Sequence, residues 1–342
     1  MGSAGTLCII AITVDLHAHT IIPRVAELVA GRFAPALDPF LRFGGESTAY
    51  NDGLATTLVP MLTDPARRIE AMDRQGIDRQ AVSIAPPHYH YWADAELGLR
   101  IARVQNDGIA ELVARHPDRF VGLGTLPMQA PEHAVEELER VVTELGFPGV
   151  SINPSAEGHD YDEPAYEPFW ARAHELGVVV VLHPNGFSNG ERLTSYYMIN
   201  IVGNPLETTV ALTHIVLGGV LERHPGIRMV AVHGGGYLPF YADRWDHAHV
   251  NRPEVGRNIS RPPSTYLGML YFDTVVFGQG LARLIELVGA DRVVMGTDYP
   301  YDMGDVDPIG RIGDLENLTP EQRRGIVGGT AAELLGLVDS AA

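Results

Sequence analysis

Short apolar runs alternate with longer amphipathic stretches along most of this chain. One of the short runs, residues 178–182, reads Val-Val-Val-Val-Leu without a polar position. A strand that is buried on both faces of a parallel sheet has this continuously apolar pattern. Eight such runs predict strands, at residues 9–16, 80–84, 120–126, 149–152, 178–182, 227–232, 270–272 and 293–295.

The longer stretches have the apolar spacing of amphipathic helices. They predict helices at residues 65–75, 95–116, 130–145, 163–176, 207–223, 281–289 and 319–337. Strands and helices that alternate in this way over about 300 residues predict an α/β fold, a closed (β/α)8 TIM barrel. An open doubly wound sheet is disfavoured, because no Gly-x-Gly-x-x-Gly motif follows the first strand.

One segment, residues 20–63, breaks the rhythm of strands and helices. It is too long for an ordinary loop between a strand and a helix, so it predicts an insertion at the top of the barrel with local structure of its own. The rest of the rhythm is continuous. We therefore expect a single barrel domain over residues 1–342.

The composition supports a large buried core, since hydrophobic residues make up 45% of the chain and charged residues 20%. Lys and Arg number 25 and Asp and Glu number 43, which gives a net charge of −18. This acidic balance argues against partners such as nucleic acid or an anionic membrane, because phosphate contacts need clustered Lys and Arg. It would also repel a carboxylate substrate unless the binding site itself is positive.

The single cysteine, Cys8, excludes an internal disulfide, so nothing indicates an oxidising compartment. The apolar run at residues 7–12 is too short to span a bilayer, and the layout of a signal peptide is missing around it. We therefore expect a cytoplasmic protein.

Five polar residues fall where predicted strands end. His17 and His19 end the first strand, His183 follows the fifth, His233 the sixth and Asp298 the eighth. A lone His-x-His pair is weak evidence in a chain with 14 histidines. However, barrel enzymes build their active sites at the carboxyl ends of the strands, and imidazoles two residues apart on a strand point the same way. The placement therefore predicts a shared metal site.

The order of these five residues resembles the amidohydrolase superfamily, and more narrowly its branch of aminocarboxymuconate-semialdehyde decarboxylases. The resemblance covers most of the chain. Besides the first His-x-His pair, the motifs that carry it are Asp-Pro-Ala-Arg-Arg-Ile-Glu-Ala-Met-Asp at 64–73, His-Pro at 183–184, His-Gly-Gly-Gly at 233–236, Arg-Pro-Pro-Ser at 261–264, Phe-Asp-Thr-Val-Val-Phe at 272–277 and Gly-Thr-Asp-Tyr-Pro at 296–300.

The resemblance implies a site with one divalent metal ion held by His17, His19, His183 and Asp298. A single ion is expected because the fourth predicted strand carries no Lys that could bridge two ions. Three imidazoles and one carboxylate suit Zn²⁺ best, and Mn²⁺ would also accept them. His233 would act beside the metal as general base or orienting group, and Asp298 would share the proton transfer.

The resemblance also implies a substrate contact across a subunit interface. In the resembling decarboxylases an Arg at the position of Arg244 reaches the partner subunit's pocket and binds a carboxylate, which implies a homodimer or a dimer of dimers. A surface ion pair with Asp243 or Asp246 is the alternative. The side chain of an arginine is always charged and can form two parallel hydrogen bonds, so it suits the binding of a carboxylate in an acidic protein.

Several residues keep two interpretations. His90 and Trp92 lie in the aromatic loop 86–92, which either lines the pocket or packs under the insertion, and Tyr197 is a further candidate for the pocket wall. Asp273 either orients a ligand histidine or caps the next helix. The glycines that follow His233 either bring backbone N–H groups to a ligand or form a tight turn.

The chain departs from the resembling decarboxylases near the substrate. No Arg falls within residues 51–60, where Thr56 stands at the expected position, and Asn185 replaces an aromatic residue. The identity of the substrate is therefore open. We expect a metal-dependent, non-oxidative decarboxylase of an unsaturated or aromatic carboxylic acid. The alternative is a hydrolase or hydratase that uses the same site on a C–C bond, lactone or amide of a ring-cleavage acid. A non-catalytic barrel is disfavoured because all five site residues are present.

Overall fold

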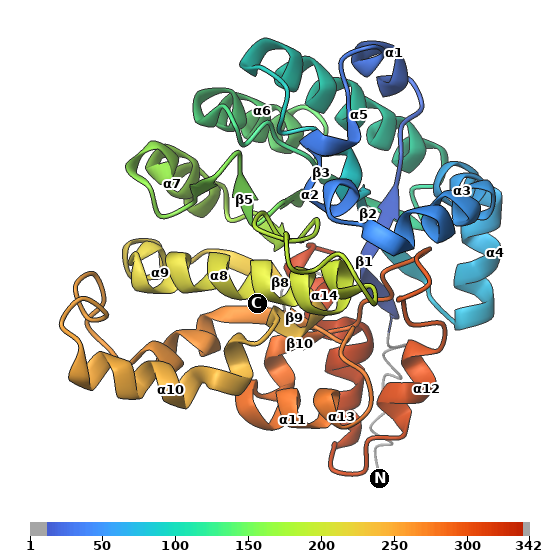
Figure 1. Cartoon of the computed structure of the whole chain (residues 1–342). Coiled ribbons are helices and arrows are strands. Elements are labelled where there is room, and N and C mark those ends of the chain that lie inside the picture. Colours follow the sequence, from blue (N-terminus) through green and yellow to red (C-terminus); the bar gives the residue numbers. More distant parts are fainter. Residues whose placement is uncertain (1–11, 338–342) are drawn as a thin grey trace, which may run out of the picture.

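The computed structural model describes residues 12–337. Its centre is a barrel of eight parallel strands surrounded by helices (Figure 1). In the order of the sheet, the strands are β1 (Val14–Thr20), β2 (Arg79–Ile84), β3 (Phe120–Gly124), β4 (Gly149–Ile152), β7 (Val179–Leu182), β8 (Arg228–Ala231), β9 (Leu270–Asp273) and β10 (Val293–Val294).

Backbone hydrogen bonds between β1 and the segment that directly follows β10 close the barrel. The amide of Leu16 donates to the carbonyl of Met295 over 2.9 Å, and the amide of His19 donates to the carbonyl of Tyr299 over 2.8 Å. A short antiparallel ribbon of β5 (Ser155–Ala156) and β6 (His159–Asp160) follows β4 outside the barrel. The prediction of an α/β fold with a (β/α)8 TIM barrel is confirmed.

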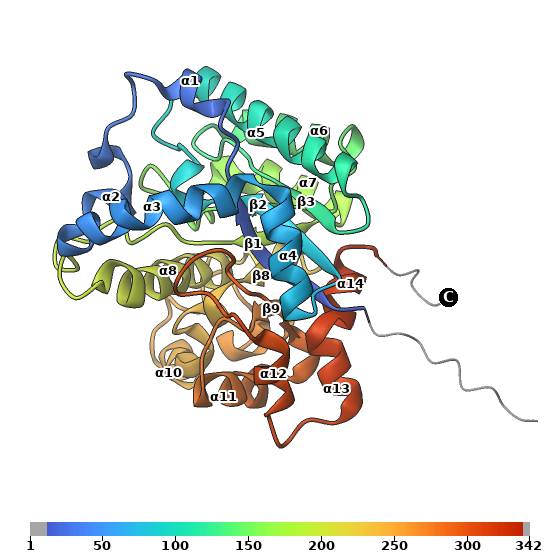
Figure 2. The same ribbon diagram turned by 90° about the vertical axis from the view of Figure 1, so that its right-hand side faces the viewer.

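Helices follow each barrel strand and cover the outside of the barrel (Figures 1 and 2). They are α4 (Pro65–Gln75), α5 (Ala95–Arg115), α6 (Pro131–Thr143), α7 (Glu167–Leu176), α8 (Asn204–Leu217), α9 (Val220–Arg223), α10 (Leu238–Asn251), α11 (Gln279–Val288), α12 (Pro308–Gly313), α13 (Pro320–Arg324) and α14 (Thr330–Leu334). Within residues 12–337 none of the helices combines the length and the apolar character that crossing a bilayer requires.

The strands bury apolar side chains on both faces. Because successive side chains point to opposite faces, their order also decides which residues point into the barrel. On β7, Val180 and Leu182 belong to the large core shared with the surrounding helices. Val179 and Val181 belong to a second buried cluster with residues of the neighbouring strands. Because side chains alternate along a strand, the next residue in the series of Val179 and Val181 is His183, which points inward at the carboxyl end of the barrel.

The first strand lies further along the chain than the sequence pattern predicts. The structure has it at Val14–Thr20 rather than 9–16, and residues 9–11, like Cys8, lie outside the described residues. His17 and His19 are therefore inside β1 and not beyond its end. The buried carboxylate of Asp15 accepts from the backbone amide of His17 and from Oγ1 of Thr297, so its burial leaves the strand intact.

One predicted helix is broken at a glycine, and another contains a π-helical turn. The stretch 207–223 divides into α8 and α9 at Gly219, whose φ of +78° does not continue a helix. The stretch 319–337 is helical from α13 to the end of α14, with a π-helical turn (Gly325–Gly329) between them. There the chain passes so close to the start of β1 that a Cβ on Gly328 would lie 1.9 Å from the carbonyl oxygen of Ile12.

The residues between β1 and α4 form three helices, α1 (Val25–Val29), α2 (Pro39–Arg42) and α3 (Thr48–Thr63). In this segment α1 packs on α5 and α3 packs on α4, at the side of the barrel that Figure 2 shows in blue. Glu46 also meets the loop after β7, because its carboxylate accepts the amide hydrogen of Tyr196. The segment therefore reaches over the end of the barrel at which the predicted site residues lie.

Candidate metal centre

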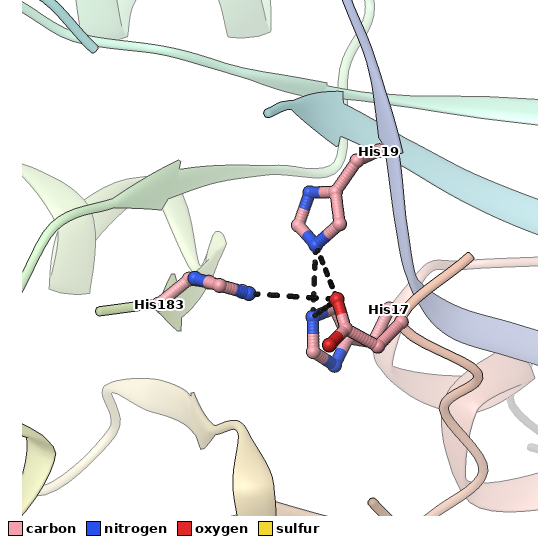
Figure 3. A group of neighbouring side chains, drawn as sticks. His17, His19 and His183 are labelled. Atoms are coloured by element: carbon pink, nitrogen blue, oxygen red, sulfur yellow. Dashed lines mark hydrogen bonds and ion pairs between the residues drawn. The ribbon is translucent and has the colours of Figure 1, made fainter. Parts of the chain in front are cut away.

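Four side chains meet at the carboxyl end of the barrel. His17 and His19 come from β1, His183 directly follows β7, and Asp298 follows β10. One donor atom from each lies within 4.8 Å of the others, and all four residues are buried. The three imidazoles point toward a common centre (Figure 3). The structure thus brings together the four residues that the sequence analysis assigns to a metal ion.

The donor atoms lie within interaction distance of one another. Nε2 of His17 lies 3.0 Å from Nε2 of His19. Oδ1 of Asp298 lies 3.0 Å from Nε2 of His19, 3.3 Å from Nε2 of His17 and 3.9 Å from Nε2 of His183. One carboxylate oxygen therefore faces three imidazole nitrogens.

The opposite nitrogen of each ring is held by a partner outside this centre. Nδ1 of His183 lies 2.8 Å from the carbonyl of Pro184, and Nδ1 of His19 lies 3.3 Å from Oγ of Ser83. When Nδ1 carries the proton and donates, Nε2 presents its lone pair to the centre. Nε2 of His183 is buried without a hydrogen-bond partner among the described residues. These donors fit a divalent metal ion, which would satisfy the three nitrogens and the carboxylate together.

Asp273, for which the sequence left two interpretations, faces His17. Its Oδ2 lies 2.6 Å from Nδ1 of His17, so it orients that imidazole. Its Oδ1 accepts from the backbone amides of Gly234 and Val275. The helix that follows, α11, has Gly278 and not Asp273 at its N-terminal cap. The structure therefore favours the orienting role.

Burial and charge together set the protonation of the centre. Burial lowers the pKa of His19 to about 4 and moves the pKa of His183 well below its usual range. Burial also opposes a charge on His17, but Asp298 and Asp273 outweigh it and raise the pKa of His17 to about 10. Burial would raise the pKa of Asp298, yet the neighbouring imidazoles hold it well below its usual range. The centre thus contains an ionised carboxylate and at least two neutral imidazoles.

His233 lies on the other side of Asp298. Its Nε2 is 3.5 Å from Oδ2 of Asp298, whereas Oδ1 faces the other three imidazoles. Both residues have positive φ, 52° for His233 and 58° for Asp298. Residues other than glycine rarely adopt this conformation, and such residues concentrate at functional sites.

The glycines after His233 form a tight turn packed against its neighbours. A Cβ on Gly234 would lie 2.1 Å from a methyl carbon of Val276, and one on Gly235 would lie 2.7 Å from the ring of Phe272. The space beside these glycines is filled by the protein itself. The structure therefore favours the turn over a ligand cradle.

The metal centre opens into two connected cavities. The first, of about 440 Å³, is the metal-side cavity; among the residues that line it are His183, His233, Asp298, Asn185 and Tyr197. The second, of about 900 Å³, is the outer cleft, which shares His233 and Asp298 with the first and is otherwise mostly apolar. Tyr197 therefore stands where the sequence analysis expects a pocket residue.

The other predicted substrate residues lie away from the metal-side cavity. Arg244 is exposed on α10, and its side chain makes no hydrogen bond or ion pair within residues 12–337. His90 and Trp92 line a separate space, the distal chamber, between the insertion and the loop after β2. One subunit by itself therefore brings Tyr197, but not these three residues, to the metal centre.

A buried network behind β1 escaped the sequence analysis. The carboxylate of Asp15 accepts from Oγ1 of Thr297 over 2.6 Å and from Nε2 of Gln80 over 2.8 Å. Arg68 donates to Oε1 of Gln80 and to the backbone carbonyl of His19. The network ties β1, β2 and the loop after β10 together beneath the centre. Strict alternation along β1 does not reveal it, because the register of β1 against β2 shifts between Asp15 and Ala18, so Asp15 and the two histidines do not share one face.

Comparison with known proteins agrees with this geometry. The sequence model of the amidohydrolase family matches residues 14–337. The 2-amino-3-carboxymuconate-6-semialdehyde decarboxylase of Dictyostelium discoideum is 35% identical over 276 residues, which cover 80% of this chain and 77% of that protein.

Two solved structures are also similar to this chain. The 5-carboxyvanillate decarboxylase of Sphingomonas paucimobilis has a TM-score of 0.84 and 29% identity, and the match covers 95% of this chain and 99% of the other. The dihydroxybenzoic acid decarboxylase of Polaromonas sp., solved with manganese and the inhibitor 2-nitroresorcinol, has a TM-score of 0.80 and 27% identity, with 95% and 97% covered.

Proposed function

Because this chain belongs to the amidohydrolase family, we propose that it is a metal-dependent, non-oxidative decarboxylase of aromatic or unsaturated carboxylic acids. The observation that carries the proposal is the buried set of three imidazoles and one carboxylate beside His233, at the end of a barrel similar to that of 5-carboxyvanillate decarboxylase. The relatives act on acids of this class, as their names state.

In this proposal His17, His19, His183 and Asp298 hold one divalent metal ion. The ion supplies Lewis-acid polarisation of the substrate oxygens when it is bound. Zn²⁺ suits a donor set rich in imidazole, whereas the manganese in the Polaromonas decarboxylase supports Mn²⁺. Elemental analysis of the purified protein by mass spectrometry decides between the two metals.

His233 and Asp298 manage the proton in the proposed reaction. Decarboxylation breaks the C–C bond to the carboxylate, releases CO₂ and leaves an electron pair on the carbon, which then takes up a proton. His233 lines both cavities at the metal centre, and its Nε2 lies 3.5 Å from Oδ2 of Asp298. His233 is therefore placed to give a proton to that carbon, with Asp298 as its partner.

The substrate carboxylate needs a cation, and we assign this role to Arg244 of a second copy of the chain. Arg244 is exposed on α10 and free of ion pairs within the described residues, so it is available to a partner subunit. The net charge of −18 does not oppose this, because salt screens surface charges beyond about 8 Å. A homodimer or a dimer of dimers and a cytoplasmic location complete the proposal.

The test is a mass balance on the metal-loaded protein. A panel of hydroxybenzoates and muconate-type acids is incubated with the enzyme in D₂O. We expect CO₂ release matched by a product that carries one deuterium at the carbon that lost it. Incorporation of ¹⁸O from labelled water without CO₂ would instead identify the hydrolase or hydratase. Decarboxylation that survives removal of the metal by a chelator would overturn the mechanism.

A further inference from the structure

The metal-side cavity has a wall of uncharged polar side chains. Burial raises the pKa of Tyr197 and of Tyr301 above the usual range, so their hydroxyls stay protonated. Neither Lys nor Arg lines this cavity or the outer cleft in the part of the chain that the structure describes. Apart from the metal centre and His233, the polar residues that line the cavity are Asn185, Tyr197, Asn200, Asn204 and Tyr301.

The side chain of Asn204 has a fixed orientation in this wall. Its Oδ1 accepts from the backbone amide of Gly186 over 2.7 Å, and because a backbone N–H only donates, the other end of the amide is Nδ2. Nδ2 has no hydrogen-bond partner within residues 12–337, yet it is not fully buried. Asn204 is only 9% exposed and lines both the metal-side cavity and the outer cleft, so the surface that it keeps faces them. Asn204 therefore offers these cavities an open donor.

The side chain of Asn185 is held in the opposite sense. Its Nδ2 donates to Oδ2 of Asp38 over 2.6 Å, and a carboxylate only accepts. Asp38 lines the distal chamber but not the metal-side cavity, whereas Asn185 lines both. The nitrogen is thus directed to the distal chamber. Oδ1, which has no partner among the described residues and is not fully buried, is left as an open acceptor for the metal-side cavity.

The two open atoms belong to neighbouring parts of the wall, since Gly186, which holds Asn204, directly follows Asn185. An acceptor beside a donor matches an uncharged group that donates one hydrogen bond and accepts another, as a hydroxyl does. A second carboxylate of a ligand can only accept, and it would meet Oδ1 of Asn185 without a cation from this subunit. The cavity, of about 440 Å³, has room for one ring.

We propose that Asn185 and Asn204 are specificity-determining residues that bind an uncharged, hydrogen-bonding substituent of the substrate, such as a hydroxyl. Asp38 is then a positioning residue, because it acts through Asn185. The proposal rests on the proposed function, which places the substrate carboxylate at the metal centre. It narrows the substrate to one-ring monocarboxylic acids with such a substituent and disfavours dicarboxylic acids.

Binding tests the two amides without reference to turnover. Isothermal titration calorimetry compares hydroxy-, methoxy- and carboxybenzoates, each substituted at ring position 3 or 4, on the metal-loaded protein. None has a hydroxyl beside the carboxylate, so all of them meet the metal in the same way. At one of the two positions we expect the hydroxybenzoate to bind about 10-fold or more tightly than its methoxy and carboxy analogues. Equal affinities, preference for another substituent at both positions, or absence of binding would overturn the proposal.

Asp38→Asn tests the positioning role. Its amide oxygen is kept by the backbone amide of Leu41, so its nitrogen donates to Asn185, whose amide then has to rotate and present Nδ2 to the cavity. A methoxy group only accepts, so the ratio of hydroxybenzoate to methoxybenzoate affinity should fall about 10-fold or more. A merely structural effect weakens both acids alike, and an unchanged ratio would remove the positioning role from Asp38.

Two further variants assign the preference to the amides. Asn204→Leu removes the open donor and Asn185→Ala the open acceptor, and each should weaken hydroxybenzoate binding about 10-fold while unsubstituted benzoate binds as before. Asn189→Ala is the matched control, because this exposed amide of the same loop lines the distal chamber and neither cavity at the metal centre. An undiminished preference for hydroxybenzoate in both variants would show that other groups select the hydroxyl.

Kinetics separate this proposal from the proposed function. We compare kcat/KM for 4- and 5-hydroxysalicylate with their methoxy analogues, whose rings are electronically similar, and expect the hydroxyl to be favoured about 10-fold or more at one position. CO₂ release from all four acids at equal kcat/KM would contradict the role of the amides alone. Preferential binding of a hydroxybenzoate without CO₂ from any acid would contradict the decarboxylase and leave the role of the amides intact.

Discussion

Oδ2 of Asp273 lies 2.6 Å from Nδ1 of His17, although 256 residues separate the two along the chain. The contact fixes which nitrogen of His17 carries the proton and which is free for the metal ion. Because Asp273 also holds the backbone amide of Gly234, the same carboxylate positions the turn that carries His233. One side chain thus sets the geometry of both halves of the proposed site.

Replacing Asp273 with Asn should therefore weaken metal binding. The amide cannot accept the Nδ1 proton as strongly as the carboxylate does, and we expect the metal affinity to fall about 10–100-fold. Competition with a fluorescent chelator measures the affinity. Asp291→Asn, at an exposed carboxylate far from the centre, is the control. An unchanged affinity in Asp273→Asn would remove the orienting role from Asp273.

His183 and His233 should separate metal binding from catalysis. His183→Ala removes a buried donor, so the protein should be purified with little metal. His233→Ala should keep the metal and lose about 10²–10⁴-fold in kcat, since it lacks the proton donor. Elemental analysis and CO₂ release measure the two effects. Loss of metal from His233→Ala would make His233 a ligand instead.

Arg244→Ala should raise KM for the carboxylate about 10–100-fold, because a charge-assisted contact is lost, and should leave unfolding unchanged. Arg252→Ala, at the end of the same helix, is the matched control. If Arg244 acts on the partner's site, mixing Arg244→Ala subunits with inactive His233→Ala subunits should restore a fraction of sites with the unaltered KM. Unaltered kinetics in Arg244→Ala would make the cross-subunit assignment wrong.

Arg68 and Arg67 offer a test of the network beneath β1. Arg68 is buried and bonded to Gln80 and to the carbonyl of His19, whereas the side chain of Arg67 is 62% exposed. Arg68→Met leaves buried acceptors without donors and should lower the free energy of unfolding by about 3 kcal/mol. Arg67→Met should change it by less than about 0.5 kcal/mol. Urea denaturation measures both, and equal effects would contradict a structural role for the network.

Asp38 should make stability depend on pH. Burial raises the pKa of Asp38 to about 6 from its ordinary value of 3.8, despite hydrogen bonds from Leu41, Asn185 and Phe40. A carboxyl whose pKa is higher in the folded than in the unfolded protein stabilises the fold fully at pH values below its unfolded pKa. This stabilisation is lost as the pH rises through its folded pKa of about 6. Asp38→Asn does not titrate. Its amide oxygen can still accept from the backbone amide of Leu41, and its amide nitrogen can donate to Asn185 once the side-chain amide of Asn185 has rotated by about 180°.

As the pH rises from 4 to 7, the unaltered protein should therefore lose up to roughly 3 kcal/mol of unfolding free energy relative to Asp38→Asn. Both proteins are measured by urea denaturation at each pH, so that pH effects common to both cancel. A difference that does not vary with pH would show that Asp38 keeps an ordinary pKa.

The sequence by itself was sufficient for the barrel and for the composition of its metal centre. Buried parallel strands must be continuously apolar, so the rhythm of the chain fixes eight strands with helices between them. In such a barrel all strands end on the same face. Polar residues at the strand ends, such as His183 and Asp298, were therefore expected to converge before any contact was known.

Element boundaries were less predictable. The first strand extends to Thr20, because its polar side chains have partners on other strands that the local sequence does not reveal. The need for a glycine at 328, in the π-helical turn, depends on the approach of Ile12 from the opposite end of the chain. Such contacts are long-range, and hydrophobic periodicity reports only on neighbours along the chain.

The tertiary structure alone decided what surrounds the metal centre. Only the structure shows that Asp273 contacts His17 and that the glycines after His233 form a packed turn. It also shows that His90 and Trp92 line a chamber separate from Tyr197. Sequence determines which residue types are available and in which periodic pattern. Which of them meet depends on how distant loops pack over one end of the barrel, because hydrogen bonds and cavities there join residues from different strands.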